Sequence, residues 1–260
     1  MITAAFRPTS LKPALTGFLR RLRDQIVPVN CLSCDRATNK LGQLCALCCS
    51  HMQFIEKPRC AVLGTPFSDD LGEGALSASA IANPPPFETS HSVALHDDTA
   101  WQLVHGLKFA DRTDLAPWMA RFMLRASESG ITAYSVIIPV ALHRCCSFMR
   151  RCNQFAEPDR HLSKVATAQY RPDLIIRSRA TKQRVGLDAK ERENNVRGAL
   201  RISKRLRYPY QGSESCAYRR CLYDRYNDPC LCRGVETCRA ARIDCPTFAR
   251  VAPGDMQTHI

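Results

Sequence analysis

Four cysteines near the N-terminus have the spacing of a metal site. Cys31 and Cys34 form one C-x2-C pair, and Cys45 and Cys48 form a second pair after ten intervening residues. Each such turn can present two sulfurs to one ion, and two turns complete a tetrahedral set of four thiolates, which suits Zn²⁺. The pattern predicts a structural zinc site. The alternative is that some cysteines are buried apolar residues, an interpretation that also suits the adjacent Cys49.

The high cysteine content has two possible explanations. The chain has 15 cysteines in 260 residues, which fits either a secreted disulfide framework or metal binding in a reducing compartment. The sequence shows no secretory signal and no run of eighteen apolar residues, so we expect a cytoplasmic protein without a transmembrane segment. The formal net charge of +13 is compatible with nucleic acid, a phosphorylated ligand or a membrane surface as partner.

The elements that would position this chemistry follow from periodicity. Residues 1–26 are basic and amphipathic and predict an N-terminal helix rather than a transit peptide. The consecutive prolines of Pro84–Phe87 predict an extended linker and a domain boundary. Beyond it we expect a helix over 99–127 that is interrupted at Asp111, followed by a buried strand over 135–140. A helix should follow within 153–168, although Pro158 is unfavourable inside a helix. The Arg-rich segment over 177–205 predicts a loop or a strand pair. This alternation indicates an α/β layer.

Several short segments, taken in order with the cysteine pairs, resemble the ComF family of competence-associated, phosphoribosyltransferase-like proteins. The segments are Leu107–Phe109, Ile138–His143, Arg150–Gln154, Arg177–Gln183 and Arg192–Gly198. The resemblance implies an α/β fold, with a type I phosphoribosyltransferase-like parallel sheet and flanking helices behind a small zinc-binding domain. It assigns residues 27–86 to the zinc-binding domain and linker, and residues 87–260 to the phosphoribosyltransferase-like domain.

The resemblance also implies a phosphoribosyl pyrophosphate site that uses Mg²⁺. Such a site must neutralise the departing pyrophosphate and position the nucleophile. The turn after the predicted strand would approach the pyrophosphate, two basic residues would supply charge, and a mobile loop would close over the donor. The residues concerned are Lys108, Pro139, Val140, His143, Arg177, Arg179, Thr181 and Gln183. The alternative for the arginines is a solvated face, and for His143 a surface histidine.

The sequence departs from the family pattern at two places. A second cysteine set is expected after the first, but Cys60 stands alone, with Leu63, Ser77 and Ala80 at the other positions, so a second metal site is doubtful. The phosphate loop of a type I core, two acidic residues followed by a Thr/Gly-rich turn, is also missing.

A shifted reading frame explains the missing loop. If the codons for residues 216–227 are read in the frame one base later, they can encode Val-Leu-Ile-Asp-Asp-Val-Tyr-Thr-Thr-Gly-Thr-Thr. The resemblance to the family resumes near residue 241. We therefore expect residues 204–240 to be out of frame, the central strand to be absent and phosphoribosyl transfer to be lost.

Three functional hypotheses follow. The chain is a phosphoribosyltransferase, or a zinc-containing module that binds single-stranded DNA or a DNA-uptake protein without catalysis, or a non-functional relic. Few aromatic residues interleave with the basic ones, so the sequence does not reveal a stacking platform for bases.

Overall fold

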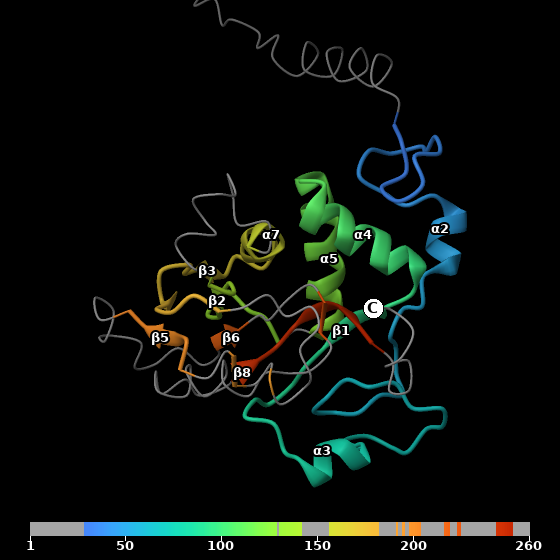
Figure 1. Cartoon of the computed structure of the whole chain (residues 1–260). Coiled ribbons are helices and arrows are strands. Elements are labelled where there is room, and N and C mark those ends of the chain that lie inside the picture. The colour runs from blue at the N-terminus through green and yellow to red at the C-terminus, as the bar shows by residue number, and fades with distance from the viewer. Residues whose placement is uncertain are drawn as a thin grey trace, which may run out of the picture.

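A computed structural model describes residues 29–128, 130–141, 156–181, 191, 194–195, 198–203, 216–218, 223–224 and 243–251. The predicted N-terminal helix over 1–26 lies outside the described residues. Within them, strands and helices are mixed, and Figure 1 shows helices α4, α5 and α7 together on one side of the strands.

The predicted interrupted helix is confirmed as two helices joined by a turn. Helix α4 spans Asp98–Phe109, the 3-10 turn η1 spans Thr113–Leu115, and α5 spans Ala116–Ala126. Asp97 begins α4, because its carboxylate accepts a hydrogen bond from the Ala100 N–H at 2.7 Å. The break falls where Asp111 adopts a left-handed backbone with φ 52°.

The predicted buried strand and the later elements are also confirmed. Strand β2 spans Val136–Ile138 and is fully buried, and α7 spans Glu157–Val165. The Arg-rich region contains the strand pair that was one of its two predicted alternatives, antiparallel β4 (Ile175–Arg177) and β5 (Leu200–Ile202). The concern over Pro158 was wrong, because this residue lies in the first turn of α7, where a proline costs no helical hydrogen bond.

Among the described residues, the strand pairings outside that hairpin are parallel. One ladder has the order β3-β2-β6-β8 and another the order β1-β9-β7. The remaining strands are β1 (Ser92–Leu95), β3 (Gln169–Tyr170), β6 (Cys216–Tyr218), β7 (Tyr223–Asp224), β8 (Ile243–Asp244) and β9 (Thr247–Arg250).

The two ladders meet along one stretch of chain. Thr89 bridges Asp244 in parallel, and β1 continues alongside β9 in the same register. Side chains reinforce this seam, because the hydroxyls of Ser92 and Thr247 lie 2.6 Å apart, and the Thr89 hydroxyl donates to the Asp244 carboxylate. The segment around β1 therefore runs beside β8 and then β9, which joins the ladders edge to edge.

The expectation that residues 204–240 leave the middle of the sheet empty was wrong. Cys216–Tyr218 forms β6, which pairs in parallel with β2 on one side and β8 on the other. Backbone N–H and C=O groups make these ladders, so a segment can fill the place without the side chains expected there.

Two buried clusters hold the fold together. The larger packs α4, α5 and α7 against β1 and β9, with Phe248 fully buried and its ring 5.7 Å from that of Trp118. The smaller joins β2 to the start of the hairpin through Val136, Ile138 and Ile175. Burying apolar surface in these clusters stabilises the fold by about 25 cal/mol for each Å² removed from water.

Candidate metal centre and the adjoining helix face

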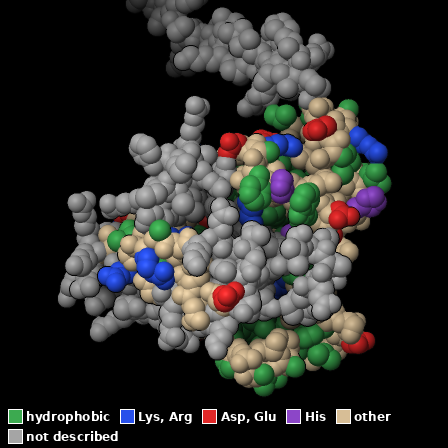
Figure 2. All heavy atoms as spheres, viewed as in Figure 1, with side chains coloured by type: hydrophobic (Ala, Val, Ile, Leu, Met, Phe, Trp, Pro, Cys, Tyr) green, Lys and Arg blue, Asp and Glu red, His purple; other side chains and the backbone are tan. Residues whose placement is uncertain are grey.

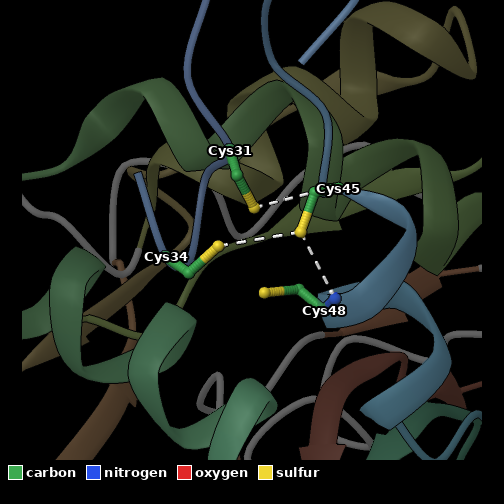
Figure 3. A group of neighbouring side chains, drawn as sticks. All are labelled: Cys31, Cys34, Cys45 and Cys48. Carbon is green, nitrogen blue, oxygen red and sulfur yellow. Dashed lines mark hydrogen bonds between the residues drawn. The ribbon is translucent and has the colours of Figure 1, made fainter. Parts of the chain in front are cut away.

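The four predicted ligand cysteines come together at one point. Cys31 and Cys34 lie on a tight turn, Cys45 is the N-cap of helix α2 (Ala46–His51), and Cys48 lies in its first turn. Their four sulfur atoms lie within 4.8 Å of one another, with Cys34 Sγ and Cys45 Sγ 3.6 Å apart. Figure 3 shows the sulfurs converging from the turn and from α2.

Backbone hydrogen bonds and burial shift the pKa values of two of these cysteines, Cys31 and Cys48, in opposite directions. The Cys45 N–H donates to Cys31 Sγ at 3.1 Å, and the Ser33 N–H donates to the same sulfur at 3.5 Å. Burial acts to raise the pKa of Cys31, but the backbone donors outweigh it and lower that pKa to about 6. Burial, followed by hydrogen bonds with the thiols of Cys34, Cys45 and Cys31, raises the pKa of Cys48 to about 12.

The donor set fits zinc. Zn–S bonds of about 2.3 Å in a tetrahedron place sulfurs about 3.8 Å apart, close to the 3.6 Å between Cys34 Sγ and Cys45 Sγ. Four thiolates fill the coordination sphere and leave no position for a substrate, so a zinc here would be structural. Its charge would stabilise the thiolates, including that of Cys48.

The metal centre is attached to the helical body on two sides. Leu32, in the first cysteine turn, is buried in the larger cluster, and its carbonyl accepts a hydrogen bond from Arg112 Nη1 at 3.1 Å. The Ser33 hydroxyl donates to Gln102 Oε1 at 2.7 Å. Beside these contacts, a pocket of about 380 Å³ is lined by Cys31, Arg112 and Arg121, among others.

An aromatic row lies on the exposed side of α4. Trp101, His105 and Phe109 follow one another at one-turn spacing, with ring centroids 4.7 Å apart at each step. Trp101 is 46% exposed and Phe109 is 66% exposed. Figure 2 shows hydrophobic side chains on either side of a histidine over the place where Figure 1 has α4. We call these three residues the aromatic row.

The sequence contains the signal for this row, because Trp101, His105 and Phe109 recur at four-residue intervals within the predicted helix. Leu103, Val104 and Leu107 are buried, whereas the spacing of Trp101, His105 and Phe109 defines a second, exposed stripe.

The structure places the residues expected to bind phosphoribosyl pyrophosphate in three regions. Lys108 is in the last turn of α4, and Pro139 and Val140 directly follow β2. Arg177, Arg179 and Thr181 lie at the end of β4 and beyond, where Arg177 Nη2 donates to the Thr181 hydroxyl and Arg179 Nη2 donates to the Asn195 carbonyl. The smaller cluster packs the hairpin against β2, so the second and third regions are neighbours. His143 and Gln183 lie outside the described residues.

Comparisons with known proteins agree with this geometry. Residues 22–80 match the family model of the double zinc ribbon domain, so the cysteine centre is a zinc ribbon. The chain is similar to proteins named DNA utilization protein YhgH. The Shigella flexneri protein is 28% identical and that of Escherichia coli strain K12 is 27% identical, each over 193 residues covering 72% of this chain and 81% of the relative. No solved structure matches the chain.

Helix α4, at 12 residues the longest in the described part of the chain, is well short of the roughly 20 apolar residues that a membrane-spanning helix needs.

Proposed function

We propose that this protein binds single-stranded DNA on the surface formed by its zinc ribbon and the exposed face of α4, and that it does so without phosphoribosyl transfer. The observation that carries the proposal is the aromatic row. Exposed aromatic rings provide platforms on which unpaired bases stack, because every base has a π-face. The similarity to proteins named for DNA utilization supports DNA as the ligand.

Basic side chains border this surface. Arg36 and Lys40 are exposed on the zinc ribbon, and Arg121 is exposed on α5 where it lines the pocket beside Cys31. The contact between Ser33 and Gln102 holds the ribbon next to the aromatic row, since Gln102 directly follows Trp101. Phosphates are attracted by such cations while bases stack on the rings.

The remaining body supports a phosphoribosyltransferase-like origin without a working donor site. Its parallel ladders, with α4, α5 and α7 on one side, are the type of layer that the resemblance implies. The acidic pair and the Thr/Gly-rich turn that would hold the ribose and its phosphate are not in the sequence. We expect no binding of phosphoribosyl pyrophosphate with Mg²⁺, and titration calorimetry that detects such binding would refute this part of the proposal.

The reading frame is tested separately, by the nucleotide sequence that encodes residues 200–245. The proposal predicts that the frame one base on spells two aspartates followed by a Thr-Thr-Gly turn. If that frame spells nothing of the kind, residues 204–240 are a divergent segment in their own right.

The DNA proposal is tested by the fluorescence anisotropy of a labelled oligothymidylate titrated with the full chain. Changing Trp101 to alanine should weaken binding by about 5- to 150-fold, since base stacking on an aromatic side chain contributes about 1–3 kcal/mol. The matched control is Tyr134→Ala, because Tyr134 is also an exposed aromatic, at 75%, but follows α5 rather than lying on α4. Equal affinities for the chain and the Trp101 variant would refute the proposal.

The same titration at several salt concentrations tests the role of the cations. If Arg36, Lys40 and Arg121 each neutralise one phosphate, the logarithm of the association constant should fall against the logarithm of salt concentration with a slope of about −2. A binding constant that does not change with salt would contradict an electrostatic contribution.

A further inference from the structure

We propose that the second half of the double zinc ribbon match, residues 58–82, repeats the backbone of the first and folds without a metal ion, so that of these two ribbons only the first holds zinc. This inference is independent of DNA binding. It rests on a backbone that repeats while the metal ligands do not.

The two segments make the same backbone contacts at equivalent positions. Both begin with an antiparallel bridge, close a turn with paired N–H to C=O hydrogen bonds, and end in a short helix, α2 in the first and α3 (Ala78–Ala82) in the second. The bridge Asn30–Ala37 in the first segment matches the bridge Arg59–Pro66 in the second. The hydrogen bond from Cys31 N to Arg36 O (2.7 Å) matches that from Cys60 N to Thr65 O (2.8 Å). The hydrogen bond from Leu32 N to Gln43 O (3.1 Å) matches that from Ala61 N to Ala75 O (2.9 Å).

The turns repeat their rare backbone conformations as well. Asp35 has φ 58° and its equivalent Gly64 has φ 64°, whereas Gly42 has φ 73° and its equivalent Gly74 has φ 79°. Left-handed residues at both matching places are difficult to obtain except from a shared fold.

Hydrogen bonds around the ligand positions are the same in both ribbons, although the side chains at those positions differ. Cys60 takes the place of Cys31, and its sulfur accepts the Ser77 N–H at 3.2 Å, as Cys31 accepts that of Cys45 at 3.1 Å. Ser77 caps α3 through the Ala80 N–H at 3.4 Å, as Cys45 caps α2 through Cys48 at the same distance.

This donor set does not fit zinc. Leu63 and Ala80 stand where Cys34 and Cys48 stand in the first ribbon, so the second offers one thiol, one hydroxyl and two side chains without donor atoms. A structural zinc site needs four ligands that bind it, and a neutral serine hydroxyl is not among the usual ones. Cys60 is fully buried and keeps only its hydrogen bonds.

Contacts with β9, with the segment before β1 and with the end of α5 hold this turn without a metal ion. Leu63 is half-buried against the smaller cluster, and its carbonyl accepts a hydrogen bond from Arg250 of β9. The preceding Val62 carbonyl accepts the Ser90 N–H at 2.7 Å. Arg59, whose side chain is 6% exposed, reaches Glu128 at 2.8 Å and the Ala126 carbonyl at 3.1 Å. Together these contacts hold the turn that a zinc ion would otherwise hold.

Metal content tests the inference directly. The reference is the zinc content of the purified full chain, measured by mass spectrometry. Combining Leu63→Cys, Ser77→Cys and Ala80→Cys should raise this content by one zinc per chain, because the backbone already presents those positions as in the first ribbon. Adding Cys60→Ser to that variant leaves three thiols and should return the content towards the reference. A folded triple variant that gains no zinc would overturn the inference.

Hydrogen exchange on the unmodified chain gives a test that needs no variant. A strong chelator should remove protection from peptides covering 29–52 while peptides covering 58–82 stay protected, since only the first ribbon depends on metal. Matched amides are available, such as those of Cys31 and Cys60. Equal loss of protection in the two segments would overturn the inference.

Discussion

Replacing Cys48 by serine should release the zinc and reduce the stability of the helical body as well as that of the ribbon. Cys48 is a buried ligand of the four-sulfur set. A structural zinc contributes about 10–16 kcal/mol of apparent free energy to the fold of a small domain, so a ribbon with three sulfurs should not remain folded at ordinary zinc concentrations.

The effect on the body follows from what the ribbon buries. Leu32 and Met52 are both part of the larger cluster, at 5% and 4% exposure. Exposing two such side chains costs about 3–6 kcal/mol together, a large fraction of the roughly 5–15 kcal/mol that stabilises a typical domain. Unfolding of the ribbon should therefore shift the whole unfolding transition.

The assay combines zinc content with urea denaturation followed by circular dichroism. Cys49→Ser is the matched control, since Cys49 is the adjacent residue, is exposed and lies outside the four-sulfur set. We expect the Cys48 variant to lose zinc and to unfold at lower urea, and the Cys49 variant to behave as the unmodified chain. Full zinc retention in the Cys48 variant, or equal losses in both, would refute the reasoning.

Two predictions concern the backbone that supports the site. Asp97→Ala should lower the free energy of unfolding by about 1–2 kcal/mol, because Asp97 caps α4 and also accepts a hydrogen bond from the Gln53 N–H at 2.6 Å. Thermal denaturation measures this loss, and Asp97→Asn should lower the free energy of unfolding by less. Gly64→Ala should cost more than Gly72→Ala in the same assay. Both glycines have positive φ, but an added Cβ would lie 2.2 Å from the Ser90 carbonyl oxygen only at Gly64. Equal costs would show that contact with the sheet does not constrain this turn.

Much of the fold and the metal centre could be predicted because their signals are local. Two C-x2-C turns bring four sulfurs to one point wherever the intervening chain allows closure, and Cys31 to Cys48 do so. The apolar periodicity around Leu103 and Met119, and the short β-branched run before Pro139, likewise correspond to α4, α5 and β2.

The remaining features depend on contacts that periodicity does not encode. The sequence shows Leu63, Ser77 and Ala80 at three ligand positions of the second ribbon, but it does not show the non-local contacts that fix its backbone, such as that between Leu63 and Arg250. Strand β6 forms through pairing with β2 and β8 rather than through its own composition. The outward orientation of Phe109 is set by how α4 packs on the body, which leaves this ring in the exposed stripe.

The proposed DNA surface can be tested most directly through the emission of Trp101. The chain has two tryptophans, and Trp118 is buried at 7% exposure, so a base that stacks on α4 should quench Trp101 selectively. We predict saturable quenching of the full chain by oligothymidylate, weaker at higher salt, and no quenching in a Trp101→Phe variant. Unchanged Trp101 emission at saturating DNA and low salt would contradict the account.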